Sequence, residues 1–328
     1  GITSGTSTQS TPNGSDISNA IPAAPVVITP DTAFGIPWRG ALVYINDLEG
    51  KITKINLTNS AEFNEELFDQ TTLFNLRGNT TNARYSYFAM DAGVGVDSGQ
   101  LMLFGSTGNF SDLGSREDNM DNILYGVIDP HYPFFKHLND VDIPLGAKEG
   151  FVQLAHKGAE AASSIDDEDV CKNVTGEIDE EVCIGTKKAW VIKMGQDENN
   201  NFYDPKTYRK ASASPTLFKG KVYYPIYQPP PGSNKCSQGS AFICVSDDEC
   251  GTNNSAKLKL ETPVDVNNPG LNACAYVRKG VLSELVIFAD KLFANVAGPT
   301  GDEDTLFSIL SVPGEIMQNK GGWRDSSF

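Results

Sequence analysis

Several features that would assign this sequence to a common functional class are scarce or missing. Basic residues are few, because 26 lysines and arginines stand against 42 aspartates and glutamates, for a formal net charge of −16 over 328 residues. A phosphate backbone is bound through a basic face, so we expect no nucleic-acid partner. No apolar stretch reaches the roughly 18 residues that a membrane-spanning helix needs, so we expect no membrane insertion.

Signatures of catalysis are scarce as well. The histidines are His131, His137 and His156, and the spacing of the first two suits neither a zinc site nor one face of a helix. Serine-bearing turns occur without the G-x-S-x-G elbow of serine hydrolases. No glycine-rich phosphate loop leads from a strand into a helix. We therefore expect a protein that is not an enzyme.

The six cysteines lack the C-x-x-C spacing of a zinc ribbon. An even number in loop-rich surroundings favours disulfides and secretion through an oxidising compartment, with free core thiols as the alternative. Fifteen pairings are open to six cysteines. We expect Cys171 to pair with Cys183, because they flank one acidic loop, and Cys236 with Cys244. The disulfide candidates are Cys171, Cys183, Cys236, Cys244, Cys250 and Cys274.

Two parts of the chain differ in composition. Residues 1–23 are rich in serine, threonine, glycine, asparagine and proline, which is typical of a flexible linker or of a tail that docks on a partner. The sequence starts at Gly1 with neither a methionine nor a signal peptide, so we expect a mature or excised piece of a longer protein. Residues 24–328 read as a domain built mostly of strands.

The domain consists of short apolar runs bounded by Gly, Asn, Asp, Ser or Pro, which is the pattern of strands separated by turns. One helix is expected, at 60–70, with Ser60 as its N-cap. The expected strands lie at 25–29, 40–57 (two strands around a glycine turn), 99–110, 122–129, 187–194, 214–227, 240–247, 283–296 and 305–312.

Three stretches echo one another. Residues 40–57, 99–129 and 219–247 each lead from a glycine through an apolar strand to a turn and a second strand. Weak repeats of this kind are typical of propeller blades, each a small antiparallel sheet that buries its faces only by stacking on its neighbours. At roughly 45 residues per blade, we expect an all-β, modified β-propeller of about six short antiparallel blades, within a range of five to seven, with long loops.

Four stretches resemble the PilY1 family in the order in which that family has them. LMLFGSTGNFSDLGSREDNMDNILYGVID (101–129) is similar to its strand, polar loop and Tyr-Gly-Ile-x-Asp strand, and VYINDLEGKITKINL (43–57) resembles its blade hairpin. Residues 211–247 are similar to a late blade with a cysteine-bearing loop, and GGWRDSSF (321–328) resembles its closing segment.

The resemblance implies an extracellular protein associated with the type IV pilus, a cell-surface fimbrium, at whose tip the family's adhesins and biogenesis factors are found. It implies a role in pilus assembly and surface adhesion, with docking on pilin or minor pilin subunits through the loops or residues 1–40. The family's larger N-terminal adhesive region is missing from this sequence.

Three alternatives to this function stay open. One alternative is a structural subunit that decorates the filament in many copies, and another is a calcium- or glycan-binding module without a pilus role. A third is an enzyme like the quinone-dependent propeller dehydrogenases, which place one tryptophan in each blade, whereas this chain has Trp38, Trp190 and Trp323.

One loop is a candidate calcium site. In the stretch DENNNFYD, Asp197, Asn199 and Asn201 alternate, and the loop follows a strand as the family's calcium loop does. The carbonyl of Tyr203 and the carboxylate of Asp204 complete a set of hard oxygens of the kind that calcium prefers. The alternative is a solvated polar turn.

One aromatic cluster is a candidate partner-binding surface. Tyr132, Phe134 and Phe135 lie in the stretch YGVIDPHYPFFKHL. If they are exposed, such rings anchor a protein partner; the alternative is a core position beside a loop.

Overall fold

The computed structural model describes twenty strands and one 3-10 turn, η2 (Phe110–Asp112). The description that follows is limited to residues 19–29, 41–56, 69–76, 84–116, 122–129, 132, 163–164, 170–173, 189–194, 208–232, 237–251, 259–260, 274–288, 291–298 and 306–310.

The strands form four small sheets, arranged as the blades of a β-propeller. Blade 1 contains β1 (Val26–Ile28), β2 (Leu42–Asn46), β3 (Lys51–Asn56), β4 (Asp69–Asn75) and β8 (Ser163–Ser164). Blade 2 contains β5 (Asp91–Val94), β6 (Leu101–Ser106), β7 (Ile123–Asp129), β10 (Ala189–Lys193) and β9 (Val170–Asn173). Blade 3 contains β11 (Lys210–Ala211), β12 (Thr216–Phe218), β13 (Lys221–Gln228), β14 (Ser240–Asp247) and β16 (Cys274–Lys279). Blade 4 contains β17 (Val281–Leu282), β18 (Val286–Phe288), β19 (Lys291–Ala297), β20 (Leu306–Leu310) and β15 (Lys259–Leu260).

The all-β prediction is confirmed, but the predicted blade number is wrong, because the described residues form four blades and not six. Dividing chain length by blade length assumes that most residues lie in blades. Between β7 and β10, however, the described strands are only the short β8 and β9. They pair in parallel with the outer edges of blades 1 and 2 and start no blade of their own.

Two expected elements also differ from the structure. The stretch 214–227 is two strands, β12 and β13, because Lys219 and Gly220 both have positive φ angles (52° and 70°) and form a tight turn. Residues 69 and 70, at the end of the expected helix, lie in β4, while the rest of that helix lies outside the described residues.

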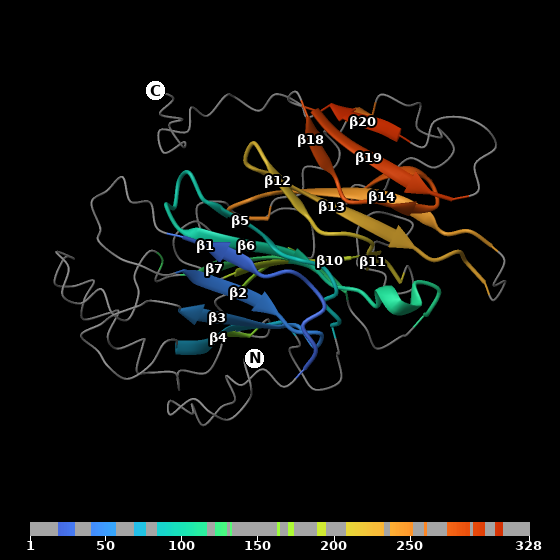
Figure 1. Cartoon of the computed structure of the whole chain (residues 1–328). Helices are drawn as coiled ribbons and strands as arrows, with labels where there is room; N and C mark the ends of the chain where they lie inside the picture. Colours follow the sequence, from blue (N-terminus) through green and yellow to red (C-terminus); the bar gives the residue numbers. More distant parts are fainter. Residues whose placement is uncertain are drawn as a thin grey trace, which may run out of the picture.

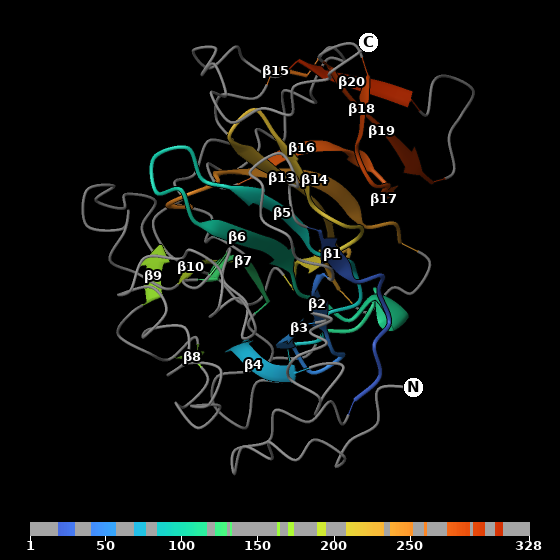
Figure 2. The ribbon, with the colours of Figure 1, turned by 60° about the vertical axis from the view of Figure 1, so that its left-hand side comes forward.

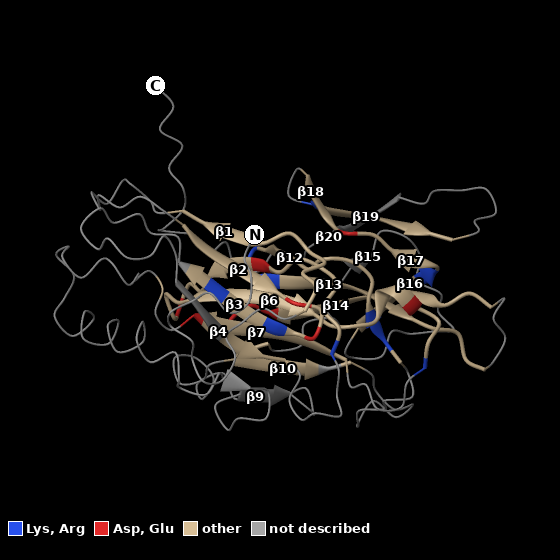
Figure 3. Ribbon diagram, turned by 60° about the horizontal axis from the view of Figure 1, so that its bottom comes forward, with Lys and Arg blue, Asp and Glu red and all other residues tan. Residues whose placement is uncertain are grey.

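Successive blades pack face to face, as Figure 1 and Figure 2 show. Alternation along each strand explains this stacking, because neighbouring side chains point to opposite faces of a sheet. In β13, Val222, Tyr224 and Ile226 face blade 2, whereas Tyr223 belongs to the core shared with blade 4. The described strands carry few charged residues (Figure 3), as buried sheets require. No described helix has the length and apolarity needed to cross a membrane.

A buried ion pair joins blades 1 and 2. The Tyr44 hydroxyl donates a hydrogen bond to the Asp129 carboxylate at 2.6 Å, and the Lys54 ammonium pairs with the same carboxylate. The Asp129 side chain is fully enclosed. Burial, together with the adjacent carboxylate, raises the pKa of Tyr44, so the phenol stays protonated and donating.

Trp190 of blade 2 docks on blade 3. Its indole N–H donates to the carbonyl of Asp248 at 2.8 Å, and its ring is 1% exposed. Gly126 lies against one part of the ring and Gly251 against another, and a Cβ at either glycine would overlap it. Gly251 also has a positive φ of 69°, so this position favours glycine for two reasons.

The end of the blades that carries the β5–β6 and β12–β13 turns is called here the turn end. At this end the carboxylate of Glu249, from blade 3, bonds to the β5–β6 turn of blade 2 and so reinforces the same junction; this set of bonds is called here the clasp. The Glu249 carboxylate accepts bonds from Asp97 N (3.1 Å), Ser98 N (2.8 Å) and the Ser98 hydroxyl (2.6 Å). Burial, and secondarily the neighbouring charges of Asp247 and Glu249, raise the pKa of Asp248 to about 6.

Candidate functional site

The opposite end of blades 1 to 3, called here the loop end, carries the loops between their two central strands. Two crossing segments, 84–88 and 208–212, connect one blade to the next and hold these loops. Gly108 N donates to the Tyr85 carbonyl at 2.8 Å, and Ala211 N donates to the Thr107 carbonyl at 3.1 Å. The loop of blade 2 is therefore fixed from both sides by backbone bonds.

Each crossing segment carries a buried arginine. The guanidinium of Arg84 donates to the carbonyl of Leu76 at 2.8 Å, so it caps the end of blade 1. Arg209 stands at the corresponding place before blade 3, and its carbonyl accepts a bond from the Asn122 amide at 2.8 Å. Both crossings thus carry a buried arginine, but the Arg84 side chain bonds to the blade that the chain leaves, whereas the Arg209 side chain bonds to Gln228 of the blade that it enters.

Lys210 fixes the tip of the blade 2 loop. Its ammonium donates to the carbonyls of Asp112 (2.8 Å) and Ser115 (2.6 Å) and to the Ser115 hydroxyl (2.7 Å). The side chain comes from β11 of blade 3 and is almost fully buried. A lysine of one blade therefore replaces water around the loop carbonyls of its neighbour and holds the loop in one shape.

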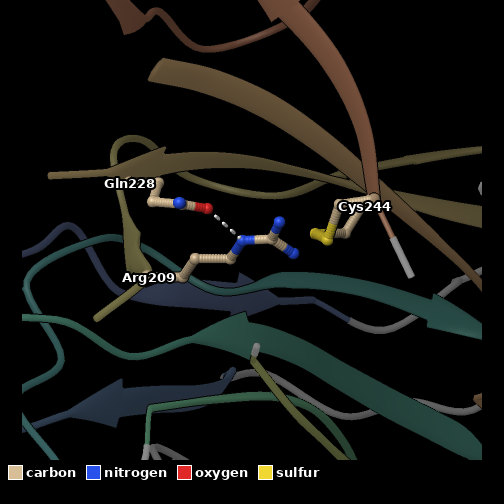
Figure 4. The surroundings of a disulfide bond; sticks show 4 residues. Arg209, Gln228 and Cys244 are labelled. Atoms are coloured by element: carbon tan, nitrogen blue, oxygen red, sulfur yellow. Dashed lines mark hydrogen bonds between the residues drawn. A yellow bond between two sulfur atoms is a disulfide. The ribbon is translucent and has the colours of Figure 1, made fainter. Parts of the chain in front are cut away.

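The side chain of Arg209 lies between blades 2 and 3, next to a disulfide (Figure 4). Its Nε donates to Gln228 Oε1 at 2.9 Å, and its guanidinium carbon lies 4.3 Å from the centre of the Phe242 ring. The disulfide joins Cys244 of β14 to Cys274 of β16, which lie directly opposite each other with their Cα atoms 4.1 Å apart. Burial lowers the pKa of Arg209 to about 10, so the side chain stays charged at neutral pH.

Aromatic side chains form the rim of the loop end. The Phe110 ring is 39% exposed and meets Phe88 edge to face at 4.9 Å, and Tyr85 and Tyr87 follow on the same crossing segment with ring centres 6.4 Å apart. The Tyr87 hydroxyl donates to Ser111, which in turn donates to the Asn109 amide oxygen.

Arg116 extends this rim onto blade 3. Its guanidinium carbon lies 5.5 Å from the centre of the Tyr208 ring, and it donates to the carbonyl of Pro230. Pro229 is buried, Pro230 is half-buried and Pro231 is exposed, so the proline-rich tip rests on the blade 2 loop.

The side chains at this end are of kinds that suit recognition. Aromatic, serine, asparagine and arginine side chains on fixed loops supply apolar contact area and adaptable hydrogen bonds, as in paratopes. Within the described residues, no group of three or more His, Cys, Asp or Glu side chains is placed to hold a metal ion.

The residues singled out from the sequence are only partly described. The calcium candidates Asp197, Asn199, Asn201, Tyr203 and Asp204 lie outside the described residues, so that site stays a prediction. Phe134 and Phe135 lie there too. Tyr132 is half-buried and packs against the core between blades 1 and 2. At the N-terminal tail, the Ala20 carbonyl accepts a bond from Leu48 N of the blade 1 hairpin at 2.8 Å.

One predicted disulfide is wrong. Cys244 pairs with Cys274 and not with Cys236, because β14 and β16 are neighbours and place the two thiols opposite each other. Cys250 is buried. The pairing of Cys171 with Cys183 stays a prediction, because those side chains lie outside the described part of the chain.

Sequence reasoning missed Arg209, Lys210 and the rim residues 85–88. A weak signal was present, because each crossing segment carries an arginine next to a tyrosine, Arg84 before Tyr85 and Arg209 after Tyr208. Arginine is usually exposed, so its burial does not follow from sequence alone.

Comparison with known proteins finds no matching protein-family model and no matching curated protein. Among solved structures, the C-terminal domain of PilY1 from Pseudomonas aeruginosa matches with 11% identity and a TM-score of 0.47, over 82% of this chain and 57% of that one. An α-L-arabinofuranosidase from Clostridium thermocellum matches with 9% identity and a TM-score of 0.32, over 84% of this chain and 60% of that one. A β-fructofuranosidase from Bombyx mori matches with 12% identity and a TM-score of 0.26, over 82% and 42%. The chain thus spans less than two thirds of each of these solved chains.

Proposed function

We propose that this chain is an extracellular, non-enzymatic β-propeller that associates with type IV pili and supports pilus assembly and surface adhesion. One observation carries the proposal. The three longest stretches that resemble PilY1, residues 43–57, 101–129 and 211–247, contain the central hairpins of blades 1, 2 and 3 in the same order. The resemblance therefore falls on the repeating unit of the fold and not on scattered loops.

The chemistry of blade 3 fits the proposed location. A disulfide between Cys244 and Cys274 forms and persists in oxidising surroundings, such as the outside of the cell. An acidic protein of net charge −16 also stays soluble there without binding anionic surfaces.

We assign pilin docking to the loop end. Its exposed Phe110 and Arg116 are of types that are enriched at protein interfaces, and Lys210 holds their loop in place. A fixed loop loses little entropy on binding, so its contacts contribute more of their energy to affinity. A matched control surface exists at the turn end, where Val94 and Val96 are about equally exposed, at 50% and 48%.

The test is co-sedimentation of the purified chain with type IV pili sheared from the producing organism. We expect the wild-type chain to sediment with the filaments. The double variant Phe110→Ala/Arg116→Ala should lose at least ten-fold in affinity, and Val94→Ser/Val96→Ser should keep it. Loss of binding in both variants, or in neither, would remove the loop end from the proposal. Wild-type protein that never sediments would remove the pilus role itself.

Electron microscopy of the same filaments separates two forms of this function. Labelled chain at one end of each filament supports a tip protein, whereas regular labelling along the shaft supports a structural subunit present in many copies. The predicted calcium loop at 197–204 is tested independently by melting, because a bound ion stabilises only the folded state. A melting temperature that EDTA leaves unchanged would remove calcium from the proposal.

One observation favours a second candidate, the quinone-dependent dehydrogenase. Trp190 docks between blades 2 and 3 through its indole N–H, as a tryptophan of such a propeller enzyme is expected to do. The test is reduction of an artificial electron acceptor by the chain after incubation with a quinone cofactor, calcium and a panel of primary alcohols. Activity above that of the heat-denatured chain would favour the enzyme over the pilus protein.

A further inference from the structure

Arg209 is a positive charge enclosed between blades 2 and 3. The residue is 2% exposed, and within the described part of the chain its side chain makes one hydrogen bond, from Nε to Gln228 Oε1, a neutral amide. The Phe242 ring covers one face of the guanidinium and is neutral as well. Nη1 has no hydrogen-bond partner among the described residues.

An enclosed charge of this kind is unusual. Buried arginines are almost always paired with a carboxylate or a phosphate, because removal from water is costly for an uncompensated ion. None of the described carboxylates forms an ion pair with Arg209. A neutral acceptor satisfies a donor hydrogen but leaves the net charge of the site at plus one. The arrangement therefore calls for an anion.

The site is held rigidly in this state. The carbonyl of Arg209 is bonded to Asn122 of blade 2, and Lys210, the next residue, is bonded to the blade 2 loop. The guanidinium points toward the disulfide of blade 3, as Figure 4 shows. Because the backbone is fixed and Nε is bonded to Gln228, Nη1 does not swing out to solvent to find a partner.

We propose that Arg209 binds a halide-sized inorganic anion at the junction of blades 2 and 3. Enclosure decides the size, because Nη1 is shielded from solvent and a phosphate or an organic carboxylate would have to part the blades to reach it. A monatomic anion takes about the space of one water molecule. It also neutralises the charge, which water does not. This inference does not depend on the pilus role.

The first experiment detects the ion directly. Crystals of the wild-type chain grown in sodium bromide should show an anomalous bromide peak within hydrogen-bonding distance of Arg209 Nη1. Bromide at surface positions only, with none at this nitrogen, would overturn the proposal. This measurement needs no variant, so a folding defect cannot obscure it.

The second experiment measures linkage to folding. The melting temperature of the wild-type chain should rise saturably with bromide at constant ionic strength, with gluconate replacing bromide, because an ion bound only to the folded state stabilises it. Arg209→Met should abolish the rise. The control Arg116→Met removes an exposed arginine of the same loop end and should keep it. An identical bromide dependence in wild type and Arg209→Met would overturn the proposal.

Discussion

The junction between blades 2 and 3 and the junction between blades 3 and 4 each have an apolar core but differ in polar bonding. At the first junction, the Trp190 indole, the Glu249 carboxylate and the Asp91 carboxylate each bond to backbone groups of the neighbouring blade. At the second, two hydroxyls make the corresponding bonds, from Ser212 to the Leu282 carbonyl and from Thr216 to the Leu285 carbonyl.

The difference shows at which junction polar bonds fix the position of one blade relative to the next. Apolar burial drives blades together but has no direction, so it tolerates sliding of one sheet over the next. Buried polar bonds have direction and are costly to leave unmade, so they fix one arrangement. The loops that form the candidate docking surface stand over the first junction. The Glu249 bonds lie at the turn end, so at the loop end of the same two blades the docking loops are held instead by Lys210 and by the backbone bonds of the crossing segments.

The largest difference between the two junctions should come from Trp190. Trp190→Ala removes a fully buried ring and the indole bond to Asp248, and we expect a loss of about 4 kcal/mol in the free energy of unfolding. Leu292→Ala at the second junction should cost about 3 kcal/mol, because only apolar packing is lost. Urea unfolding measures both. A larger loss for Leu292→Ala would break the comparison.

The next largest effect should come from the disulfide, which faces the first junction from blade 3. Cys244→Ala/Cys274→Ala removes a cross-link that spans 30 positions, and we expect a loss of about 3 kcal/mol in the free energy of unfolding. Peptide mapping of the wild-type chain under non-reducing conditions provides the control. A peptide that links Cys236 to Cys244 would contradict the pairing and the expected loss together.

This disulfide shows what sequence does and does not predict. The strands of β13 and β14 were predictable, because alternation and glycine turns are local signals. The partner of Cys244 was not, because it depends on the register of β16 against β14, which shifts at a bulge between Ala241 and Phe242. Blade number failed for the same reason, since the placing of β8 and β9 on distant edges is a long-range choice.

Only the residue composition of the loops at the candidate site was predictable from the sequence. Aromatic and proline-rich loops are visible in the sequence, but their meeting at one end depends on how blades 2 and 3 stack. The burial of Arg209 depends on the same stacking. The propeller fold could therefore be predicted from local sequence patterns, whereas the arrangement of side chains on its loop end could not.

The difference in free energy of unfolding between Asp248→Asn and wild type should change by about 2 kcal/mol between pH 4 and pH 8. The Asp248 carboxyl has a pKa of about 6 in the folded chain, above the ordinary value of 3.8, so the folded state binds the extra proton between these two values. The destabilising charge is fully present above pH 6 and is relieved as the pH falls toward 4. Asp248→Asn should therefore be more stable than wild type at pH 8 and equal to it at pH 4, in urea unfolding at both values. A constant difference across this range would show that Asp248 has no raised pKa.

A smaller effect should come from the clasp at the turn end. Glu249→Gln removes the charge from an acceptor of three hydrogen bonds, and we expect a loss of about 1.5 kcal/mol in the free energy of unfolding. Ser98→Ala removes one of those bonds and should cost less. If Glu249→Gln were neutral, the clasp would contribute no stability, and the first junction would differ from the second only through Trp190 and Asp91.

The smallest losses in the free energy of unfolding should come from the second junction. They test whether its polar bonds are weaker than those of the first junction. Ser212→Ala removes one buried hydroxyl bond of 2.9 Å and should cost about 1 kcal/mol, and Thr216→Val removes one of 3.4 Å and should cost about 0.5 kcal/mol. Both costs should stay the same between pH 4 and pH 8, because neither hydroxyl titrates there, whereas the Asp248→Asn difference should change. Urea unfolding of the two variants at both pH values measures this. A loss from Ser212→Ala as large as that from Glu249→Gln would mean that directional bonds hold both junctions alike, and the contrast between the two junctions would be lost.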